Sequence, residues 1–461
     1  MSESIVVVGA GPAGMSIATT LSEHGIRTTV VDESPKAGGV IYRGPWRTTQ
    51  AMPHLDENLQ KKIRLQQELV VKHQANIQLQ TETRVLGPLA NNQLLLSHHD
   101  KLSQLDFDYL FLATGCQERS IPFPGWQLPG VMLTGGIQLQ LKSGLVRPGH
   151  QAVLTGTGPL LILVACQLHR AGVAVQGVFD ATPFMEISKE VLALLNRPQV
   201  TLEGMSLMAY LKRHRIPVKH GWGIVKAEGG DTLERVAVAP YNRNWEADKQ
   251  HLEWIDADLL GVGYGFASRS QLAQLMDLNV RVDEFSGLIP VTDAQQRSSR
   301  ENIFCAGDSA RFAGADVAIV EGQIAALSLV AELKPEKATD IQAQLTELQK
   351  TLRRYYRFRG AFDRANQRKK GLLQLPEPDT VICRCEQVKR SAIDQAIQEG
   401  CRDTVSLKMR TRVTMGDCQG KTCSHYCYDR LAQEGFHNEQ GHFRTRFPLD
   451  PIPFSAMEDE A

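Results

Sequence analysis

The chain has 461 residues, and at about 100–200 residues per domain this length predicts two to four domains. Lys and Arg together equal Asp and Glu, so the formal net charge is zero and gives no general reason to expect a nucleic-acid partner. No apolar run approaches the roughly 18–20 residues that cross a bilayer. The N-terminus, MSESIVVVGAG, lacks the basic region of a secretory signal, so we expect a cytosolic chain.

The N-terminal segment has the pattern of a dinucleotide-binding fold. Residues 5–8 form a β-branched run, as a buried parallel strand requires, residues 15–22 predict a helix, and residues 28–31 predict a second strand. Between the first strand and the helix lies G-x-G-x-x-G, which comprises Gly9, Gly11, Pro12, Ala13 and Gly14. Glycine is needed there for the tight turn, for the approach of a pyrophosphate and for close helix packing. The helix N-terminus can then hold the phosphates.

An acidic residue follows the second strand, at the distance where a carboxylate binds a ribose hydroxyl. Asp32 ends that strand and Glu33 comes next, so both are candidate ribose ligands. The strand, glycine turn, helix, second strand and acid occur together. A loop of flexible glycines would explain none of the flanking pattern.

Two later stretches favour FAD over NAD. DYLFLATG, residues 108–115, is a predicted strand that runs into a turn at Ala113, Thr114 and Gly115. NIFCAGD, residues 302–308, is another strand, ends in Gly307 and Asp308, and precedes a helix over about 316–333.

This set resembles the two-dinucleotide-domain flavoproteins, the thioredoxin-reductase-like and ferredoxin-reductase-like enzymes. The resemblance implies that Asp308 binds the ribityl and pyrophosphate end of FAD, and that Gly38 and Gly39 are the family's glycine pair. The alternative for Asp308 is a helix N-cap. Arg43 and Arg119 are expected near the flavin and could bind a substrate carboxylate, although surface ion pairing is the favoured alternative for both.

A second strand–turn–helix pattern lies between the two FAD stretches. Its turn has Gly156 and Gly158, its helix covers 160–168, and its second strand ends near Asp180. Leu161 stands where only a small residue allows tight packing of helix on strand. We therefore predict a Rossmann fold that has lost or altered its cofactor, and NAD(P)H use is not expected. Cys166 lies on the apolar helix and is interpreted as a core residue.

A basic segment follows the FAD stretches. Residues 342–370 are predicted to be helical and include KTLRRYYRFRGAFDRANQRKK. Three hypotheses stay open for this segment: a solvated linker, a docking surface for a partner subunit, and a surface for acidic lipid heads. Linker and subunit contact are favoured over membrane. Pro376 and Pro378 then mark a domain boundary.

The C-terminal part has four cysteines that could hold a metal. Cys383 and Cys385 form C-x-C, and Cys418 and Cys423 follow with glycines at 416 and 420. Four thiolates can hold a [2Fe–2S] cluster or a zinc ion. C-x-C is a poor zinc signature, so [2Fe–2S] is favoured, while zinc and plain thiols stay open. Cys401 and Cys427 do not fit the pattern and are expected to be buried.

The cysteine spacing resembles the bacterioferritin-associated-ferredoxin-like [2Fe–2S] domain. The whole chain resembles the larger subunits of bacterial amine and amino-acid dehydrogenase complexes, a family that includes opine oxidases and hydroxyproline and proline dehydrogenases. GGVIYRGP and LKMRTRVTMGDCQGKTC look closest to the members that oxidise glycine to hydrogen cyanide and carbon dioxide.

The resemblance implies an electron-transfer subunit with FAD and a [2Fe–2S] cluster; FMN at a subunit interface stays open. Its implied partners are a D-amino-acid-oxidase-like flavoprotein, a respiratory acceptor and a small [2Fe–2S] ferredoxin-like subunit, located at the cytoplasmic face of the cell membrane. No acid/base pair or Ser/His/Asp set stands out, so no catalytic residue is assigned. An NAD(P)H-dependent flavin reductase and an iron–sulfur sensor are the alternatives.

The predicted architecture is α/β, with two Rossmann-like domains and a small α-rich ferredoxin-like domain. The predicted boundaries are an FAD domain at 1–125 and 266–335, an inserted NAD(P)-like domain at 126–265, a basic linker at 336–375, the [2Fe–2S] domain at 376–435 and a tail at 436–461.

Overall fold

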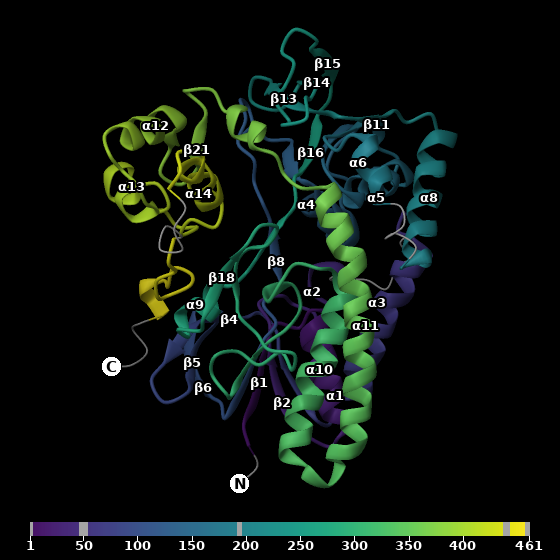
Figure 1. The fold of residues 1–461 in the computed structure, drawn as a ribbon, viewed down its shortest axis with the longest axis vertical. Helices are drawn as coiled ribbons and strands as arrows, with labels where there is room; N and C mark the ends of the chain where they lie inside the picture. The colour runs from purple at the N-terminus through teal and green to yellow at the C-terminus, as the bar shows by residue number, and fades with distance from the viewer. Residues whose placement is uncertain (1–2, 46–53, 191–195, 437–442, 457–461) are drawn as a thin grey trace.

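The structure is a computed structural model that describes residues 3–45, 54–190, 196–436 and 443–456. Two five-stranded sheets, each with helices packed against it, form the body of the molecule, and a small helical module lies beside them (Figure 1). No helix within these ranges has the length and apolarity to cross a bilayer. Part of the predicted tail, 437–442 and 457–461, lies outside the described residues.

The first sheet contains the N-terminal glycine turn. Its strand order is β20-β7-β1-β2-β3, and the pairs are parallel. The bounds are β1 Ile5–Val8, β2 Thr28–Val31, β3 Ile77–Gln80, β7 Tyr109–Leu112 and β20 Ile303–Cys305. The predicted strands 5–8 and 28–31 are confirmed.

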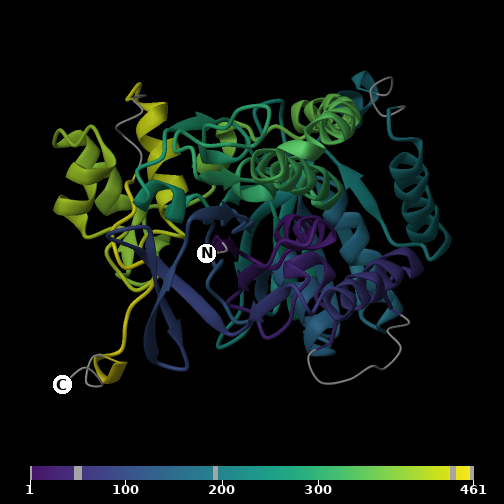
Figure 2. The same cartoon turned by 90° about the horizontal axis from the view of Figure 1, so that it is seen from below.

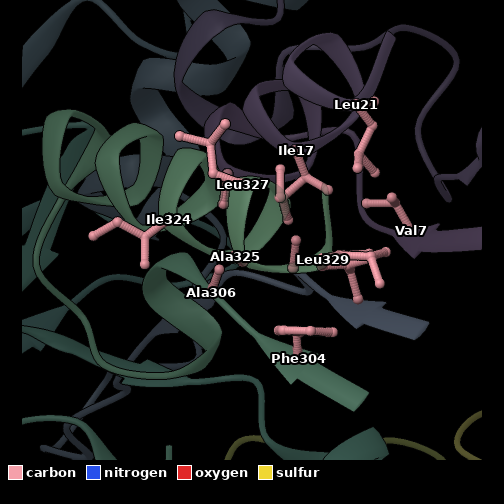
Figure 3. Packing of buried hydrophobic residues seen from close by; sticks show 14 of the residues in the cluster. Val7, Ile17, Leu21, Phe304, Ala306, Ile324, Ala325, Leu327 and Leu329 are labelled. Carbon is pink, nitrogen blue, oxygen red and sulfur yellow. The ribbon is translucent and has the colours of Figure 1, made fainter. Parts of the chain in front are cut away.

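Both faces of β1 are covered, which explains its unbroken apolar sequence. Val7 packs into a core with helices α1 (Pro12–Glu23) and α10 (Ala315–Leu333), as Figure 3 shows. Val6 and Val8 face the opposite side and pack in a cluster with residues of β5 (Gln93–His98). A parallel strand buried on two faces gains from β-branched residues at every position.

Helix α11 (Ala338–Ala365) is part of this core, although the sequence suggested a linker. Ile341, Leu345 and Leu352 are buried in the same cluster as α1 and α10. Figure 1 shows α10 and α11 running side by side. The buried residues recur at helical spacing, so α11 is amphipathic and only its outer face is solvated.

The second sheet has the order β12-β11-β10-β16-β9 and is also parallel. Its bounds are β9 Val131–Leu133, β10 Gln151–Gly156, β11 Ala174–Asp180, β12 Val218–His220 and β16 Leu259–Gly263. Helices α4 (Thr134–Leu139), α5 (Pro159–Arg170) and α8 (Pro198–Arg213) accompany it. Cys166 is fully buried in this core, as predicted.

Two short antiparallel strands connect the halves. β8 (Cys116–Glu118) leaves the first sheet's β7 and pairs with β17 (Phe266–Ser268), which returns from the second sheet. Three smaller antiparallel sheets were not anticipated from the sequence. They are β4–β5–β6 (Thr83–Leu89, Gln93–His98, Lys101–Asp106), β13–β14–β15 (Trp222–Glu228, Arg235–Pro240, Glu253–Asp256) and β18–β19 (Val280–Asp283, Gly287–Pro290).

The C-terminal module packs around its own apolar cluster. Its elements are β21 (Val381–Cys383), β22 (Val388–Lys389), α12 (Arg390–Gln398), α13 (Thr404–Thr411) and α14 (Ser424–Gln433). Figure 2 shows the module on the side of the molecule opposite α8 and α3 (Glu57–Lys72). The segment around Pro376 joins the module to the body through buried Leu373 and Leu375. This boundary is therefore packed, not an open linker.

Candidate flavin site and cysteine module

The N-terminal glycine turn is built so that no side chain fits at two of its glycines. Gly9 has φ +105°, and a Cβ there would lie 2.3 Å from the Ala113 carbonyl oxygen. A Cβ on Gly14 would lie 1.8 Å from the Gly9 carbonyl oxygen. Strand β7 and helix α1 therefore close on the turn, and the first turn of α1 points toward the edge where β1 ends.

The middle glycine differs, because the protein leaves room beside it. The nearest atom to a Cβ on Gly11 would be the Gly39 Cα at 3.8 Å, while Gly115 and Gly314 have nothing within 4 Å. Gly38 and Gly39 both have positive φ and start the short helix α2 (Gly39–Tyr42) against the turn. Gly11, Gly115 and Gly314 thus have room beside them, whereas Gly38 and Gly39 pack tightly on neighbouring backbone, and such a cradle fits a dinucleotide pyrophosphate.

The two acidic residues after β2 have different surroundings. Asp32 is buried; one carboxylate oxygen accepts the Ala10 N–H at 2.6 Å and the other accepts the Ser34 N–H at 2.7 Å. Both oxygens of Asp32 thus stabilise the turn itself. Glu33 is 45% exposed and pairs with Arg269 at 2.7 Å; these contacts outweigh burial, so its pKa is lowered. Glu33 is therefore the carboxylate that has access to a ligand.

The segment after the glycine pair is anchored by a buried lysine. Lys142 is fully buried, and its Nζ donates to the carbonyl oxygens of Val40 at 2.6 Å and Ile41 at 2.7 Å. Burial, with the nearby Arg43 cation, lowers the pKa of Lys142 to about 7. Arg43 donates to the Ser34 hydroxyl and is also buried. The predicted surface position of Arg43 is wrong, because its side chain is 7% exposed.

Asp308 stabilises the approach to α10. Its Oδ1 accepts the N–H groups of Ala313 and Gly314, each at 2.9 Å, and its Oδ2 lies 3.5 Å from the Cys116 sulfur. Asp308 therefore holds the backbone just ahead of α10, but the N-cap position of this helix is Gly314, so Asp308 is not its N-cap. Burial, with Asp308 beside it, raises the pKa of the Cys116 thiol, which therefore stays protonated near neutral pH.

The second glycine turn is covered by the C-terminal end of α11. Gly158 faces the Phe362 ring, with the ring carbon 3.7 Å from where a Cβ would lie. The Asn366 side-chain oxygen accepts from the Thr157 hydroxyl at 2.8 Å and from the Thr182 hydroxyl at 3.2 Å. Side chains of α11 therefore lie against the turn where a pyrophosphate would bind in a Rossmann domain.

The ribose position of this second fold is also engaged. Asp180, at the end of β11, accepts the Thr182 N–H at 2.9 Å and lies 3.3 Å from His220 Nδ1. That contact is the largest cause that raises the pKa of His220. Leu161, which stands in place of the third glycine, is buried against Gly263. Leu161 stood out in the sequence, whereas Asn366 did not, because nothing local marks a helix end that packs on a distant turn.

The four predicted thiols lie together in two pairs. Cys423 is the largest cause of the lowered pKa of Cys383, and Cys418 contributes to the raised pKa of Cys385. Cys423 also interacts electrostatically with Cys418, so the two pairs are adjacent. Within the described ranges, no three His, Cys, Asp or Glu side chains are already gathered as a metal site.

The surroundings of these thiols differ: they favour the thiolate at Cys383, whereas the interaction with Cys383 and burial raise the pKa of Cys423, and the pKa of Cys385 is raised as well. The hydrogen bond from Cys423 is the largest cause that lowers the pKa of Cys383 to about 6. Burial opposes it, and further lowering comes from the backbone N–H groups of Glu386, Thr414 and Cys385. A Cβ on Gly416 would lie 2.2 Å from the Cys385 Cβ, so the loop passes close to the thiols. N–H groups directed at sulfur fit a four-thiolate iron–sulfur site.

The other two cysteines lie in the module's apolar cluster. Cys427 is 1% exposed, as expected for a packing residue. Cys401 is only partly buried at the edge of that cluster, because it follows the end of α12.

The loop between Cys418 and Cys423 is held against β8. Gln117 donates to the Lys421 carbonyl oxygen at 2.9 Å, and Ser120 donates to the Thr422 carbonyl oxygen at 2.9 Å. The tail binds the same loop from the other side, since Gln419 donates to the Pro448 carbonyl oxygen at 2.9 Å. Strand β8 begins at Cys116, whose sulfur lies beside Asp308. One short segment therefore contacts both the loop that contains Gly307 and Asp308, called the flavin-side loop below, and the loop between Cys418 and Cys423, called the thiol loop.

Arg119 connects the module to the body as well. It donates to Asp429 at 3.0 Å, so the predicted ion pair is present. Its side chain is only 5% exposed, so the predicted surface position is wrong. Arg119→Ala is expected to lower the stability of the docked module by about 1–3 kcal/mol, the usual cost of losing a charged hydrogen bond. Limited proteolysis near residues 376–380 would measure this, with Arg410→Ala as control, because Arg410 pairs with Glu399 on the exposed surface of the module. Equal cleavage rates in the two variants would contradict it.

Comparisons with known proteins agree with this architecture. The family model "Pyridine nucleotide-disulphide oxidoreductase" matches residues 3–322, and the "Sarcosine oxidase A3 domain" model matches residues 378–460. Hydrogen cyanide synthase subunit HcnB of Pseudomonas protegens is 45% identical over 99% of this chain and 98% of its own. An opine oxidase subunit from Agrobacterium tumefaciens is 31% identical over 98% of this chain and 91% of its own.

Among solved structures, L-proline dehydrogenase from P. horikoshii shares the fold with a TM-score of 0.69 at 19% identity, covering 99% of this chain and 79% of that chain. The glycine cradle, the second Rossmann fold and the cysteine module define a flavoprotein oxidoreductase of the pyridine nucleotide-disulphide class. More narrowly, the chain belongs to the family that contains hydrogen cyanide synthase subunit HcnB and the related opine oxidase subunits.

Proposed function

We propose that this chain is the flavin and iron–sulfur electron-transfer subunit of an amino-acid dehydrogenase complex that converts glycine to hydrogen cyanide and carbon dioxide. The observation that carries the substrate is the 45% identity to an HcnB subunit over nearly the full length of both chains. Loss of four electrons and four protons from glycine leaves one hydrogen cyanide and one carbon dioxide, so the reaction needs two two-electron steps.

The glycine cradle and the start of α1 would hold the pyrophosphate of FAD, and Glu33 would accept the ribose hydroxyls. Cys383, Cys385, Cys418 and Cys423 would hold a [2Fe–2S] cluster. FAD supplies two-electron acceptance and the cluster supplies one-electron transfer when they are bound. Between them, β8 fixes the thiol loop beside the loop of Asp308.

The amino-acid oxidation itself is proposed to occur on a D-amino-acid-oxidase-like partner, with a respiratory acceptor and a small ferredoxin-like subunit completing the complex. The membrane contact would be peripheral, through the complex. FMN at a subunit interface is compatible with this arrangement.

The alternative of an NAD(P)H-dependent flavin reductase is disfavoured by the contacts of α11 at the second turn. Phe362 and Asn366 lie where the pyrophosphate would bind, and Asp180 is paired with His220. Anaerobic mixing of the flavin-loaded chain with NADH is therefore expected to leave the flavin absorbance unchanged over minutes. Rapid bleaching would replace the relay with a reductase.

The substrate is tested by co-expressing the chain with the reading frames beside its gene and supplying glycine. Cyanide release with dye reduction is the expected result. Dye reduction by an opine or proline, with no cyanide from glycine, would instead support the function named for the opine oxidase relatives, which are 28–31% identical.

A further inference from the structure

The outer face of α11 has a row of arginines without acidic partners. Arg353, Arg354 and Arg357 are exposed, and none of them has an ion pair within the part of the chain that the structure describes. Farther along the same helix, Arg359 pairs with Asp363 at 2.6 Å and Arg364 pairs with Glu190 at 2.8 Å. The unpaired charge is thus confined to one stretch of the helix, where residues three and four apart share a face.

A cavity opens beside this row. It has a volume of about 440 Å³, and arginines from three separate segments line it: Arg281 of β18, Arg311 after β20 and Arg353 of α11. Gln349 and Tyr356 of α11 add polar groups. Side chains from distant parts of the sequence therefore place guanidinium groups and hydrogen-bond donors around one hollow, although Arg281 and Arg311 lie 3.8 and 3.6 Å from an Asp283 carboxylate oxygen.

The cavity reaches toward the flavin-side loop. Its lining includes Glu321, which is 1% exposed and accepts the Gly307 N–H at 2.7 Å. Gly307 precedes Asp308. The lining has two acidic side chains, Glu321 and Asp293. The Oδ1 of Asp293 accepts two N–H groups of its own turn, and burial raises the pKa of Glu321 to about 7. Because Arg281 and Arg311 pair with Asp283, the lining arginine without an acidic partner among the described residues is Arg353.

The composition of this face argues against a lipid surface as its ligand. A helix that lies on a membrane presents large apolar side chains next to its basic ones. No large apolar side chain in the described part of α11 is exposed, since Leu352 is buried and the tyrosines at 355 and 356 are half-buried. An acidic protein surface needs only charge complementarity, which α11 offers.

We propose that the basic face formed by Arg353, Arg354 and Arg357 docks an acidic segment of the amino-acid-oxidising partner subunit. This inference rests on the proposed function, because that function requires such a partner. Docking at this face would place the partner beside the cavity whose lining touches Gly307, on the flavin side of the molecule.

The test is binding of the co-expressed oxidase-like subunit to the flavin-loaded chain and to the double variant Arg353→Glu/Arg357→Glu. The variant is expected to bind about ten-fold or more weakly in 0.15 M salt and to lose most of the salt dependence of Kd. The matched control is Lys61→Glu/Arg64→Glu, which reverses two exposed charges on α3 and should bind as the unmodified chain does.

Unchanged binding of the Arg353→Glu/Arg357→Glu variant, with cyanide production intact, would overturn the docking face and leave the proposed function standing. No binding by the unmodified chain, and no amino-acid-dependent dye reduction, would overturn both. Sedimentation with phosphatidylcholine/phosphatidylglycerol vesicles gives the remaining outcome. Vesicle binding by the unmodified chain that the variant loses, while both bind the subunit equally, would assign the face to a membrane and overturn the protein partner.

Discussion

Cys418→Ser is expected to remove the brown colour, the iron and acid-labile sulfide, and the reduced-state electron paramagnetic resonance signal of the chain. Cys418 contributes to the raised pKa values of both Cys385 and Cys423, so its thiol belongs to the same group. A serine hydroxyl is a poor ligand for a site that selects thiolates. Iron per chain, measured by elemental analysis, should fall from about two to near zero if four thiolates hold a [2Fe–2S] cluster.

Cys427→Ser is the matched control, because this cysteine belongs to the same module and is as deeply buried as Cys423. It should keep the colour and the iron at the cost of some stability. Loss of iron in both variants would mean that the module simply unfolds, and a circular dichroism spectrum would reveal that. Zinc in place of iron in the unmodified chain, with folding intact, would show that the four thiols form a structural metal site.

Gly11→Ala is expected to lower the affinity for FAD by about ten-fold to a hundred-fold, which corresponds to the roughly 1–3 kcal/mol that an extra methyl group costs in a close contact. The protein itself tolerates this methyl group, since Gly11 has φ −75° and the nearest atom to the new Cβ lies 3.8 Å away. Only a ligand that approaches the turn would meet it. Flavin content after purification and a titration of the apoprotein with FAD measure the effect.

Gly204→Ala is the control for Gly11→Ala. Gly204 lies in α8, a Cβ there would meet nothing within 4 Å, and alanine is the better helix former. Its flavin content should match that of the unmodified chain. Full FAD affinity in Gly11→Ala, with the fold intact, would show that the pyrophosphate does not lie against this turn and would contradict the proposed binding mode.

The Cys418→Ser and Gly11→Ala experiments address two separate sites of the proposed electron-transfer subunit. Strand β8 is the segment that joins these two sites. The contacts of Gln117 and Ser120 with the thiol loop are intact only if the module is docked, so the Arg119→Ala result bears on both. A chain that binds FAD and iron but loses the docked arrangement would retain both sites without a fixed distance between them.

The sequence by itself determined the first dinucleotide fold. The β-branched run at 5–8, the glycines of the turn and the start of α1 are local features, and each is dictated by the backbone conformation or burial at its own position. The same holds for the Gly-x-Gly turn of the second fold and for the spacing of the four thiols. Local rules of this kind need no knowledge of distant residues.

Tertiary structure alone decided which of these sites are accessible and how they are joined. The contact of Thr157 with Asn366 spans 209 residues, and that of Arg119 with Asp429 spans 310. No periodicity or motif records such pairs, because each partner looks locally like an ordinary polar residue. Asp32 and Glu33 show the same limit: the sequence made both candidates for the ribose, and only the fold shows that both Asp32 oxygens accept backbone N–H groups while Glu33 is 45% exposed. Burial and partner geometry, which arise only when distant segments pack, distinguish a glycine turn with room beside it from one that a neighbouring helix contacts.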